Sequence, residues 1–207
     1  MYKHFFKPLI DRLLALLMII ILLPFLAIIC LLIIIFNNSS PFFVQPRPGL
    51  NEKIFNLVKF KTMTDERDAN GCLLEDYERT TKLGSFLRNT SIDELPELFN
   101  ILKGEMSFIG PRPLLIEYIP KYTKNQRLRH KIKPGVTGLA QTSGRNLLSW
   151  EEKFTLDIEY VNNISFLGDL KIMLRTIVVL FTAKDINQSD KITMQKFTGS
   201  IKEDNAK

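Results

Sequence analysis

Residues 13–36 read LLALLMIIILLPFLAIICLLIIIF, and none of these 24 side chains is charged. As an α-helix the run reaches about 36 Å, enough to cross a hydrocarbon core of about 30 Å. A single membrane span is therefore one interpretation. Pro24 lies near the midpoint, where a proline removes a backbone hydrogen bond and kinks the helix. A helix that enters the bilayer, bends at Pro24 and leaves by the same face is the second interpretation.

The charges on both sides of this run favour the second interpretation. Lys3, Lys7 and Arg12 precede it, and basic residues also follow it: Arg47, Lys53, Lys59 and Lys61. Basic flanks tend to stay on the cytoplasmic side of a membrane. We therefore predict a re-entrant, helix-break-helix hairpin with both ends in the cytoplasm.

The remaining sequence has an ordinary water-soluble composition and is long enough for one compact domain. We predict three parts: a re-entrant membrane helix (1–40), a cytoplasmic domain with interfacial helices (41–183) and a polar C-terminal tail (184–207). Cys30 lies in the apolar run and Cys72 in a polar stretch, so no disulfide is expected and a reducing compartment fits.

The patterning of residues 41–183 predicts a mainly α domain with a little β. Residues 41–50 look like a proline-rich connector, and residues 134–149 like a glycine-rich loop. The alternating stretch 53–63 is typical of a strand or hairpin. Helices are expected at about 91–102, 112–122 and 150–161.

Residues 169–182 (DLKIMLRTIVVLFT) form a further amphipathic segment. Its apolar residues fall on one helical face: Leu170, Met173, Leu174, Ile177, Val178 and Phe181. A helix of the domain core and a helix lying in the plane of the membrane surface both fit this pattern.

The stretch between Tyr118 and Trp150 contains no acidic residue but seven cations: Lys121, Lys124, Arg127, Arg129, Lys131, Lys133 and Arg145. Solvated faces usually mix both signs, so an anionic partner is expected. Lipid headgroups and nucleotide phosphates fit. Nucleic acid does not, because the stacking aromatics and familiar motifs are missing.

Ser91-Ile92-Asp93-Glu94 permits two interpretations. Ser91 and Glu94 have the spacing of a capping box at the start of a helix. Alternatively, Asp93 and Glu94 are functional carboxylates, kept ionised by the helix dipole. An ionised aspartate is a competent nucleophile toward phosphorus. Two carboxylates also suit Mg²⁺, which binds carboxylates together with substrate phosphates.

Two further motifs offer groups for an anion. In Gly110-Pro111-Arg112-Pro113, two prolines fix the backbone around one arginine, which is then oriented to form a fork on a phosphate. A rigid turn with an incidental arginine is the alternative. Residues 135–145 (GVTGLAQTSGR) provide amides and hydroxyls that can cradle an anion, although they match no nucleotide-binding fingerprint.

Together these motifs closely resemble the bacterial sugar transferases, the monotopic polyprenyl-phosphate phosphoglycosyl transferases. The similarity lies in KFKTM (59–63), in SIDELPELFNILKGEMSFIGPRP (91–113) and in PGVTGLAQ (134–141) followed by Gly144-Arg145. It covers nearly the whole chain. The chain looks most like the short, single-function type, in particular the undecaprenyl-phosphate diacetylbacillosamine-1-phosphate transferases of protein glycosylation.

The resemblance implies transfer of a sugar-1-phosphate from a UDP-sugar to polyprenyl (undecaprenyl) phosphate, with release of UMP. It implies a covalent phosphosugar intermediate on Asp93, with Glu94 as metal-associated or base partner and Mg²⁺ bound at the pair. Substrate contacts are expected from Lys59, Arg88, Arg112, Gln141 and Arg145. The expected partners are the UDP-sugar, the polyprenyl phosphate and membrane phospholipids, at the cytoplasmic face of a bacterial inner membrane.

One position departs from the family pattern, because Leu23 stands before Pro24 where small members often have serine. The missing hydroxyl weakens the expectation of re-entry. Two other functions remain open beside the transferase. One is a membrane-anchored sugar-nucleotide or lipid-binding protein without activity, and the other is a hydrolase of the lipid phosphate.

Overall fold

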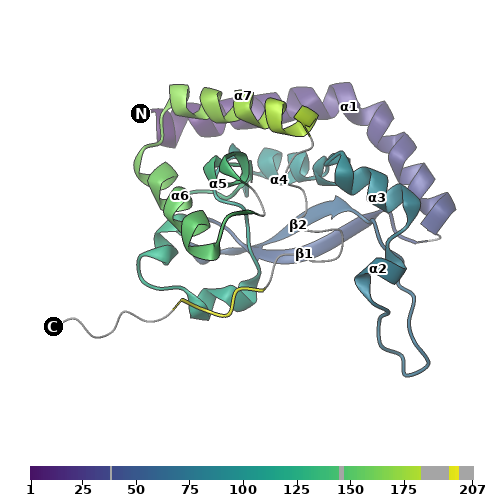
Figure 1. The fold of residues 1–207 in the computed structure, drawn as a ribbon. Helices are drawn as coiled ribbons and strands as arrows, with labels where there is room; N and C mark the ends of the chain where they lie inside the picture. The colour runs from purple at the N-terminus through teal and green to yellow at the C-terminus, as the bar shows by residue number, and fades with distance from the viewer. Residues whose placement is uncertain (38, 145–146, 183–195, 201–207) are drawn as a thin grey trace.

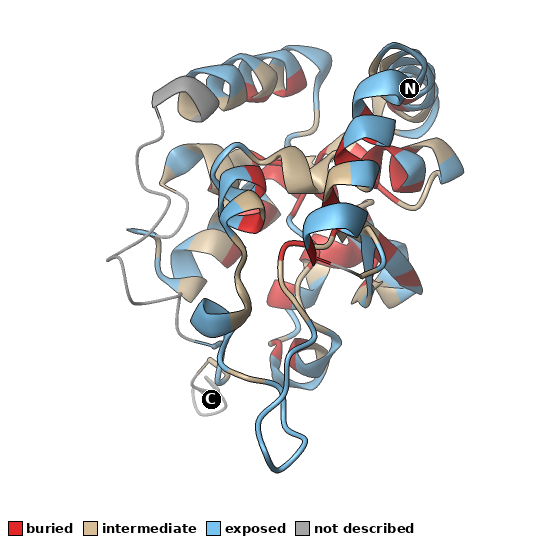
Figure 2. Ribbon diagram, turned by 90° about the vertical axis from the view of Figure 1, so that its right-hand side faces the viewer, coloured by how far each residue is buried: buried red, intermediate tan, exposed pale blue. Residues whose placement is uncertain are grey.

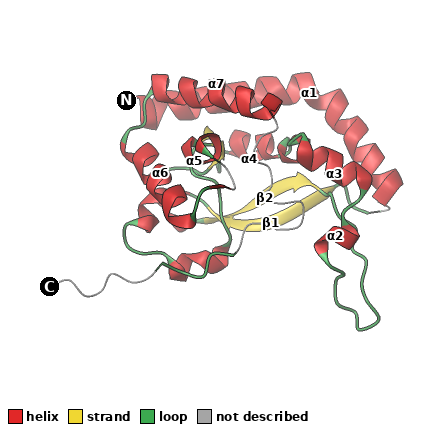
Figure 3. Ribbon diagram, viewed as in Figure 1, coloured by secondary structure: helices red, strands yellow, loops and turns green. Residues whose placement is uncertain are grey.

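Helices dominate the computed structural model, which describes residues 1–37, 39–144, 147–182 and 196–200 (Figures 1 and 3). Its strands form two small sheets, each with two strands. The predicted mainly α fold with a little β is confirmed.

The apolar run forms helix α1 (Lys7–Asn37), which follows a π-helical turn, η1 (Tyr2–Phe6). Pro24 lies inside α1. The helix is long and apolar enough to cross a membrane, but it changes direction part-way along its length (Figure 1). The two half-helices expected around Pro24 are therefore joined in one bent helix.

Both halves of α1 pack on the same domain. Ala15 and Ile19 contact a core cluster with Leu98 and Ile101 of α4 (Glu97–Lys103). In the second half, Leu26, Ile29 and Ile33 join a cluster with Phe60 and Leu87. A helix that rests on one domain along its length does not lead away from it, which supports the re-entrant interpretation.

The opposite side of α1 exposes large apolar side chains, among them Leu13, Leu17, Ile20, Ile21, Leu31 and Ile35. Helix α7 (Phe166–Thr182) lies on the same side of the molecule and likewise turns exposed residues outward and buried ones toward the domain (Figure 2). Its Leu167, Leu170, Leu174 and Val178 are exposed, whereas Ile172 is buried. Most of the predicted apolar face of residues 169–182 is thus turned away from the core, which favours the membrane-surface interpretation. Met173 packs partly against the core, and the side chain of Phe181 lies outside the described residues.

The first sheet pairs β1 (Phe42–Pro48) antiparallel with β2 (Ile54–Phe60) around a 3-10 turn, η2 (Leu50–Glu52). The strand predicted within residues 53–63 is confirmed, but the connector predicted at 41–50 is wrong. Phe42, Phe43 and Val44 favour a strand. Prolines are tolerated there because β1 has only one neighbour in its sheet.

The second sheet is parallel and joins β3 (Ser107–Ile109) to β4 (Gly135–Thr137). The backbones meet closely beside it, since a Cβ on Gly135 would lie 2.1 Å from the nitrogen of Gly110. Only glycine fits there. The loop predicted at 134–149 is therefore wrong over β4 and over α5 (Leu139–Ser143).

The other helices are short, except α6. They are α2 (Asp76–Arg79), α3 (Lys82–Asn89), the 3-10 turns η3 (Ile92–Glu94), η4 (Ile116–Lys121) and η5 (Gln126–Lys131), and α6 (Trp150–Asn162). Helix α6 was predicted. The helix expected at about 112–122 is present only as the 3-10 turn η4 and begins later than predicted, because a residue before proline avoids the helical region.

The C-terminal tail is described only over residues 196–200. There Phe197 is 2% exposed and belongs to a core cluster with Tyr118, Tyr122 and Phe154. Phe197, in the segment predicted as a polar C-terminal tail, therefore packs into the core of the domain.

Candidate active site

Asp93 and Glu94 lie on the 3-10 turn η3, directly before α4. Ser91 opens this turn in the left-handed conformation, with φ of +56°, and its side chain makes no capping bond. A non-glycine residue held there costs about 1–3 kcal/mol. The capping-box interpretation is therefore wrong, and the helix predicted from about 91 begins as α4 at Glu97.

Glu94 is held by two cations from distant parts of the chain. Its Oε1 accepts a hydrogen bond from Lys59 Nζ of β2 and another from Arg112 Nη2, each at 2.6 Å. Burial works to raise the pKa of Glu94, but Arg112 and Lys59 outweigh it and hold the pKa well below its usual range. Glu94 is therefore the fixed anion of the site.

Glu97 is a third carboxylate in the cluster. Its Oε1 lies 3.2 Å from Lys59 Nζ, and the residue is only 3% exposed. Burial raises the pKa of Glu97 to about 7, and the neighbouring Glu94 adds to the rise. Lys59 thus faces one firmly ionised carboxylate and one that takes up a proton readily.

The Asp93 carboxylate makes no direct hydrogen bond or ion pair with the part of the chain that the structure describes. Burial raises its pKa above the usual value, and Glu94 contributes to the rise. Lys59, Arg112 and Arg88 oppose it. Burial and the charged neighbours thus set the pKa of Asp93, and the expectation that a helix dipole keeps this carboxylate ionised stays a prediction.

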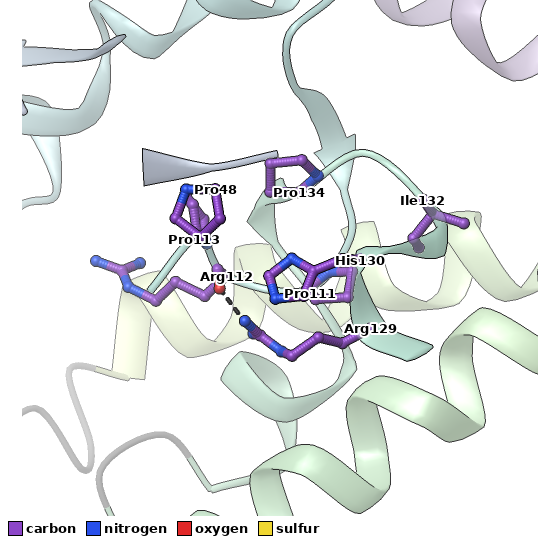
Figure 4. A pocket seen from close by; sticks show the side chains of 8 residues that line it. All are labelled: Pro48, Pro111, Arg112, Pro113, Arg129, His130, Ile132 and Pro134. Atoms are coloured by element: carbon purple, nitrogen blue, oxygen red, sulfur yellow. Dashed lines mark hydrogen bonds between the residues drawn. The ribbon is translucent and has the colours of Figure 1, made fainter. Parts of the chain in front are cut away.

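Arg112 reaches the cluster from the turn after β3. The carbonyl of Pro111 accepts a hydrogen bond from Gly135 N (3.0 Å), and the carbonyl of Arg112 accepts one from Arg129 Nη2 (2.8 Å). The turn borders a small depression, where Figure 4 shows the Arg112 side chain pointing away from that of Arg129. The depression is lined by Pro48, Pro111, Arg112, Pro113, Arg129, His130, Ile132 and Pro134.

The other predicted substrate residues differ in how they relate to the dyad. Arg88 of α3 donates from Nε to Thr62 Oγ1 (2.8 Å) and acts on the pKa of Asp93. Gln141 lies in α5 beside Gly138, and its buried amide atoms have no hydrogen-bond partner among the described residues. Arg145 lies outside the described residues.

The acid-free stretch is less available to an external anion than its sequence indicates. Arg127 forms an ion pair with Glu52 at 2.9 Å, and Arg129 forms one with Asp157 at 2.8 Å. Both acids lie far away in the sequence. The prediction of seven cations free for a partner is thus wrong for these two.

Sequence reasoning also missed Arg47 as a residue of the site. It lies on β1, where Nη2 donates to Gln45 Oε1 (2.6 Å) while the buried Nε has no partner in the described part of the chain. Burial lowers the pKa of Arg47, and Arg112 adds to that effect.

Glu97 was missed as well. The sequence signal that could have identified it as a site residue is its position three residues after Glu94, on the same side of a helical turn.

Comparison with known proteins identifies this arrangement. The family model described as bacterial sugar transferase matches residues 2–183. The chain belongs to the bacterial sugar transferase family. In this sugar transferase the Asp-Glu pair and the Pro-Arg-Pro turn lie within the matched residues.

Named relatives agree with the assignment. The transferase is 54% identical to the uncharacterized sugar transferase EpsL of Bacillus subtilis, over 78% of this chain and 80% of EpsL. It is 38% identical to the exopolysaccharide production protein ExoY of Sinorhizobium fredii, over 67% of this chain and 69% of ExoY. It is also 38% identical to the UDP-glucose:undecaprenyl-phosphate glucose-1-phosphate transferase of Klebsiella pneumoniae, over 69% of this chain but only 33% of that protein.

The prediction of an enzyme of the phosphoglycosyl transferase class is confirmed by the family and by these relatives. A binding protein without activity is thereby set aside. Several relatives are much longer than this chain, which spans about a third of the galactosyl transferase CpsE of Streptococcus agalactiae (34%). The roles of individual residues stay predictions.

Proposed function

We propose that this transferase moves a sugar-1-phosphate from a UDP-sugar to undecaprenyl phosphate and releases UMP. The observation that carries the proposal is the contrast between two adjacent carboxylates. Glu94 is neutralised by Lys59 and Arg112, whereas the Asp93 carboxylate has no direct partner among the described residues. One is held in place and the other is free to react. The names of two relatives, from Klebsiella pneumoniae and Komagataeibacter xylinus, include undecaprenyl phosphate, which supports the acceptor.

Asp93 is the proposed nucleophile. One of its oxygens forms a bond to the sugar-bearing phosphorus while that phosphorus separates from the bridging oxygen, and UMP leaves with the electron pair. In the second step an oxygen of undecaprenyl phosphate bonds to the same phosphorus. The bond to Asp93 breaks, and the carboxylate is restored.

In this scheme the basic side chains near the dyad bind the phosphate groups of the substrates. Lys59 and Arg112 already converge on one oxygen of Glu94, and Arg88 acts on Asp93. Positive groups fixed around a reacting phosphoryl group stabilise the charge that builds up on it. Gln141 contributes buried amide groups that lack partners among the described residues, and such groups are expected to bind a polar ligand atom.

Mg²⁺ fits the donor set at this turn. Asp93 and Glu94 supply hard carboxylate oxygens, and the described residues contain no group of three or more His, Cys, Asp or Glu placed to hold a metal alone. Mg²⁺ commonly binds one or two carboxylates and completes its shell with substrate phosphates and water. When bound, it would offset negative charge on the transferred phosphoryl group.

The membrane arrangement follows from α1 and α7. Both expose apolar side chains, both lie on the same side of the molecule (Figures 1 and 2), and α4, which follows the dyad, packs directly against α1. We propose that the two helices sit among phospholipids of the cytoplasmic leaflet of the inner membrane. The dyad then lies close to the depth of a lipid-linked phosphate.

The experiment is UMP release by the purified protein with a panel of UDP-sugars, with and without undecaprenyl phosphate. Diacetylbacillosamine or another N-acetylated sugar stays the narrower prediction, and glucose and galactose belong in the panel because relatives are named for them. Acceptor-dependent UMP release is expected. Without acceptor, no more than the one UMP per enzyme released by the covalent step is expected, and continued UMP release without acceptor would indicate a hydrolase instead.

Asp93→Asn tests the covalent step. The amide keeps the size of the side chain but loses its nucleophilic charge, so transfer is expected to stop while the melting temperature stays close to that of the wild type. Mass spectrometry of the wild type, incubated with UDP-sugar alone, is expected to find a phosphosugar on Asp93. Near-normal transfer by Asp93→Asn would rule out the covalent mechanism.

A further inference from the structure

Arg129 is a buried arginine behind the Pro-Arg-Pro turn, on the side away from the dyad. Its Nε and Nη2 donate to Asp157 Oδ2 at 3.0 and 2.8 Å, and the side chains of the pair are 3% and 5% exposed. The guanidinium also lies 5.9 Å from the ring centre of Tyr122 and 5.7 Å from that of Phe154. Charge, hydrogen bonds and aromatic faces thus hold it in one place.

The same guanidinium holds the turn that presents Arg112. Nη2 donates to the carbonyl oxygen of Arg112 at 2.8 Å, as Figure 4 shows. The preceding carbonyl, of Pro111, is held by Gly135 N. Because Pro111 and Pro113 have no N–H, these two carbonyl contacts fix the backbone at the point where the Arg112 side chain leaves it.

Phe197 of the C-terminal segment closes the aromatic wall around Arg129. Its ring centre lies 5.1 Å from that of Phe154 and 5.8 Å from that of Tyr122. Its backbone is held as well, because its N–H donates to Tyr118 Oη (3.3 Å) and its carbonyl accepts from Lys121 Nζ (3.1 Å). Removing this ring would therefore uncover the parts of the Tyr122 and Phe154 rings that it now contacts.

We propose that Arg129 is a positioning residue for Arg112, and that Phe197 completes its support, so that UDP-sugar binding depends on the C-terminal segment. The inference rests on the proposed function, in which Arg112 contacts the UDP-sugar. A buried ion pair by itself is weak support for stability, since apolar replacements are often as stable. Because Arg129 also contacts the Arg112 carbonyl, we assign the ion pair a different role. It fixes the direction in which the substrate-binding side chain of Arg112 leaves the backbone.

Arg129→Lys separates charge from geometry. Lysine keeps the positive charge beside Asp157 but has no planar fork with which to bind Asp157 and the Arg112 carbonyl together. We expect KM for the UDP-sugar to rise about tenfold, the size of one lost charge-assisted contact, while kcat changes by less than about threefold. Calorimetric titration with UMP is expected to show the same loss of affinity without turnover.

The double variant with Arg112→Ala identifies the route of the effect. If Arg129 acts through Arg112, Arg129→Lys raises KM in the wild type but has little further effect once Arg112 is gone. An equal effect in both backgrounds would overturn the proposal. If the wild type itself showed no acceptor-dependent UMP release, the proposed function would be refuted instead.

Phe197→Ala is expected to raise KM in the same direction, and Phe197→Leu to restore most of the affinity because it keeps the apolar filling. The matched control is Tyr77→Ala, which removes an aromatic ring that is 78% exposed. If Phe197→Ala fails to fold, a KM for Phe197→Leu between the wild-type and Arg129→Lys values supports the proposal. Wild-type KM in Arg129→Lys, or in a folded Phe197→Ala, would overturn it.

Discussion

Replacing Gly84 by alanine tests how α3 holds Arg88 beside the dyad. The α3 backbone approaches Thr62 so closely that a Cβ on Gly84 would lie 1.9 Å from the Thr62 carbonyl oxygen, 2.7 Å from its carbon and 2.9 Å from its Cα. The side chain of the same Thr62 accepts the hydrogen bond from Arg88 Nε. One added methyl group therefore disturbs both the packing of α3 and the position of a predicted substrate-binding arginine.

Two opposing effects set the magnitude. Alanine is the better helix former, by about 1 kcal/mol. Against this, the 1.9 Å contact must open to at least 3.0 Å, and the atoms in the way are backbone atoms that no side-chain rotation can move. Overpacking typically costs about 1–3 kcal/mol, and backbone overlap places this case at the upper end. The expected net loss is about 2 kcal/mol, a fall in Tm of roughly 4–8 °C for a chain of this size.

The assay is thermal unfolding in one detergent or nanodisc preparation, paired with UMP release. Ser85→Ala, at an exposed position of the same helix, is the matched control and is expected to change Tm by less than about 1 °C. Gly84→Ala is also expected to lower kcat/KM, because Arg88 moves with the helix. An unchanged or higher Tm in Gly84→Ala would show that helix propensity outweighs the overlap and would refute the reasoning.

Three further predictions concern Arg112, His130 and the orientation of α1. Arg112→Lys is expected to weaken UDP-sugar affinity by about 1–3 kcal/mol, because lysine lacks the planar fork; an unchanged KM would reduce the turn to a structural role. Burial, with Arg129 adding to it, lowers the pKa of His130 to about 4. Below about pH 6.5 the unfolded chain therefore binds a proton at His130 that the folded protein does not bind. The free energy of unfolding is expected to fall by up to about 3 kcal/mol as the pH falls toward 4. Glu97 has a raised pKa and changes stability in the opposite direction, so the wild type must be compared with His130→Gln. The measurement is the free energy of unfolding of both proteins at about pH 7.5 and pH 5. Equal pH dependence in the two proteins would contradict the lowered pKa of His130. For topology, Lys3→Cys and Asn51→Cys, each placed alone in a chain without Cys30 and Cys72, are both expected to resist a membrane-impermeant thiol reagent in intact cells, whereas labelling at position 3 alone would indicate a true span.

The features predicted correctly from the sequence are those with a local signal. Helices α1, α6 and α7 have apolar runs or helical periodicity that a window of residues reveals. The Asp93-Glu94 pair and the Pro-Arg-Pro turn stand out as short motifs, and the structure brings Arg112 to Glu94, while their roles in the reaction stay predictions. The bend in α1 was expected because Pro24 is a local cause.

The features that were missed depend on partners far along the chain. Strand β1 was hidden by Pro46 and Pro48, which an edge strand tolerates. The parallel pairing of Ser107–Ile109 with Gly135–Thr137 joins two strands of three residues across a long connection. The sequence of either strand carries no signal of its partner. The same holds for the Arg129–Asp157 pair, because a run of cations does not reveal which member is neutralised internally.

The packing of α1 along the domain has a consequence for biosynthesis. The helix is made first, but Asp11 bonds to Ser107, which lies 96 residues later, and Lys7 pairs with Asp169, which lies 162 residues later. Synthesis proceeds at about 5–20 residues per second, so Lys7 waits roughly 8–30 seconds for its partner to leave the ribosome. During that interval the domain cannot yet cover the apolar face of α1, and we expect the bilayer to cover it. We therefore expect insertion to precede assembly of the domain, with lipid as a temporary partner for the side of the helix that the finished protein covers itself.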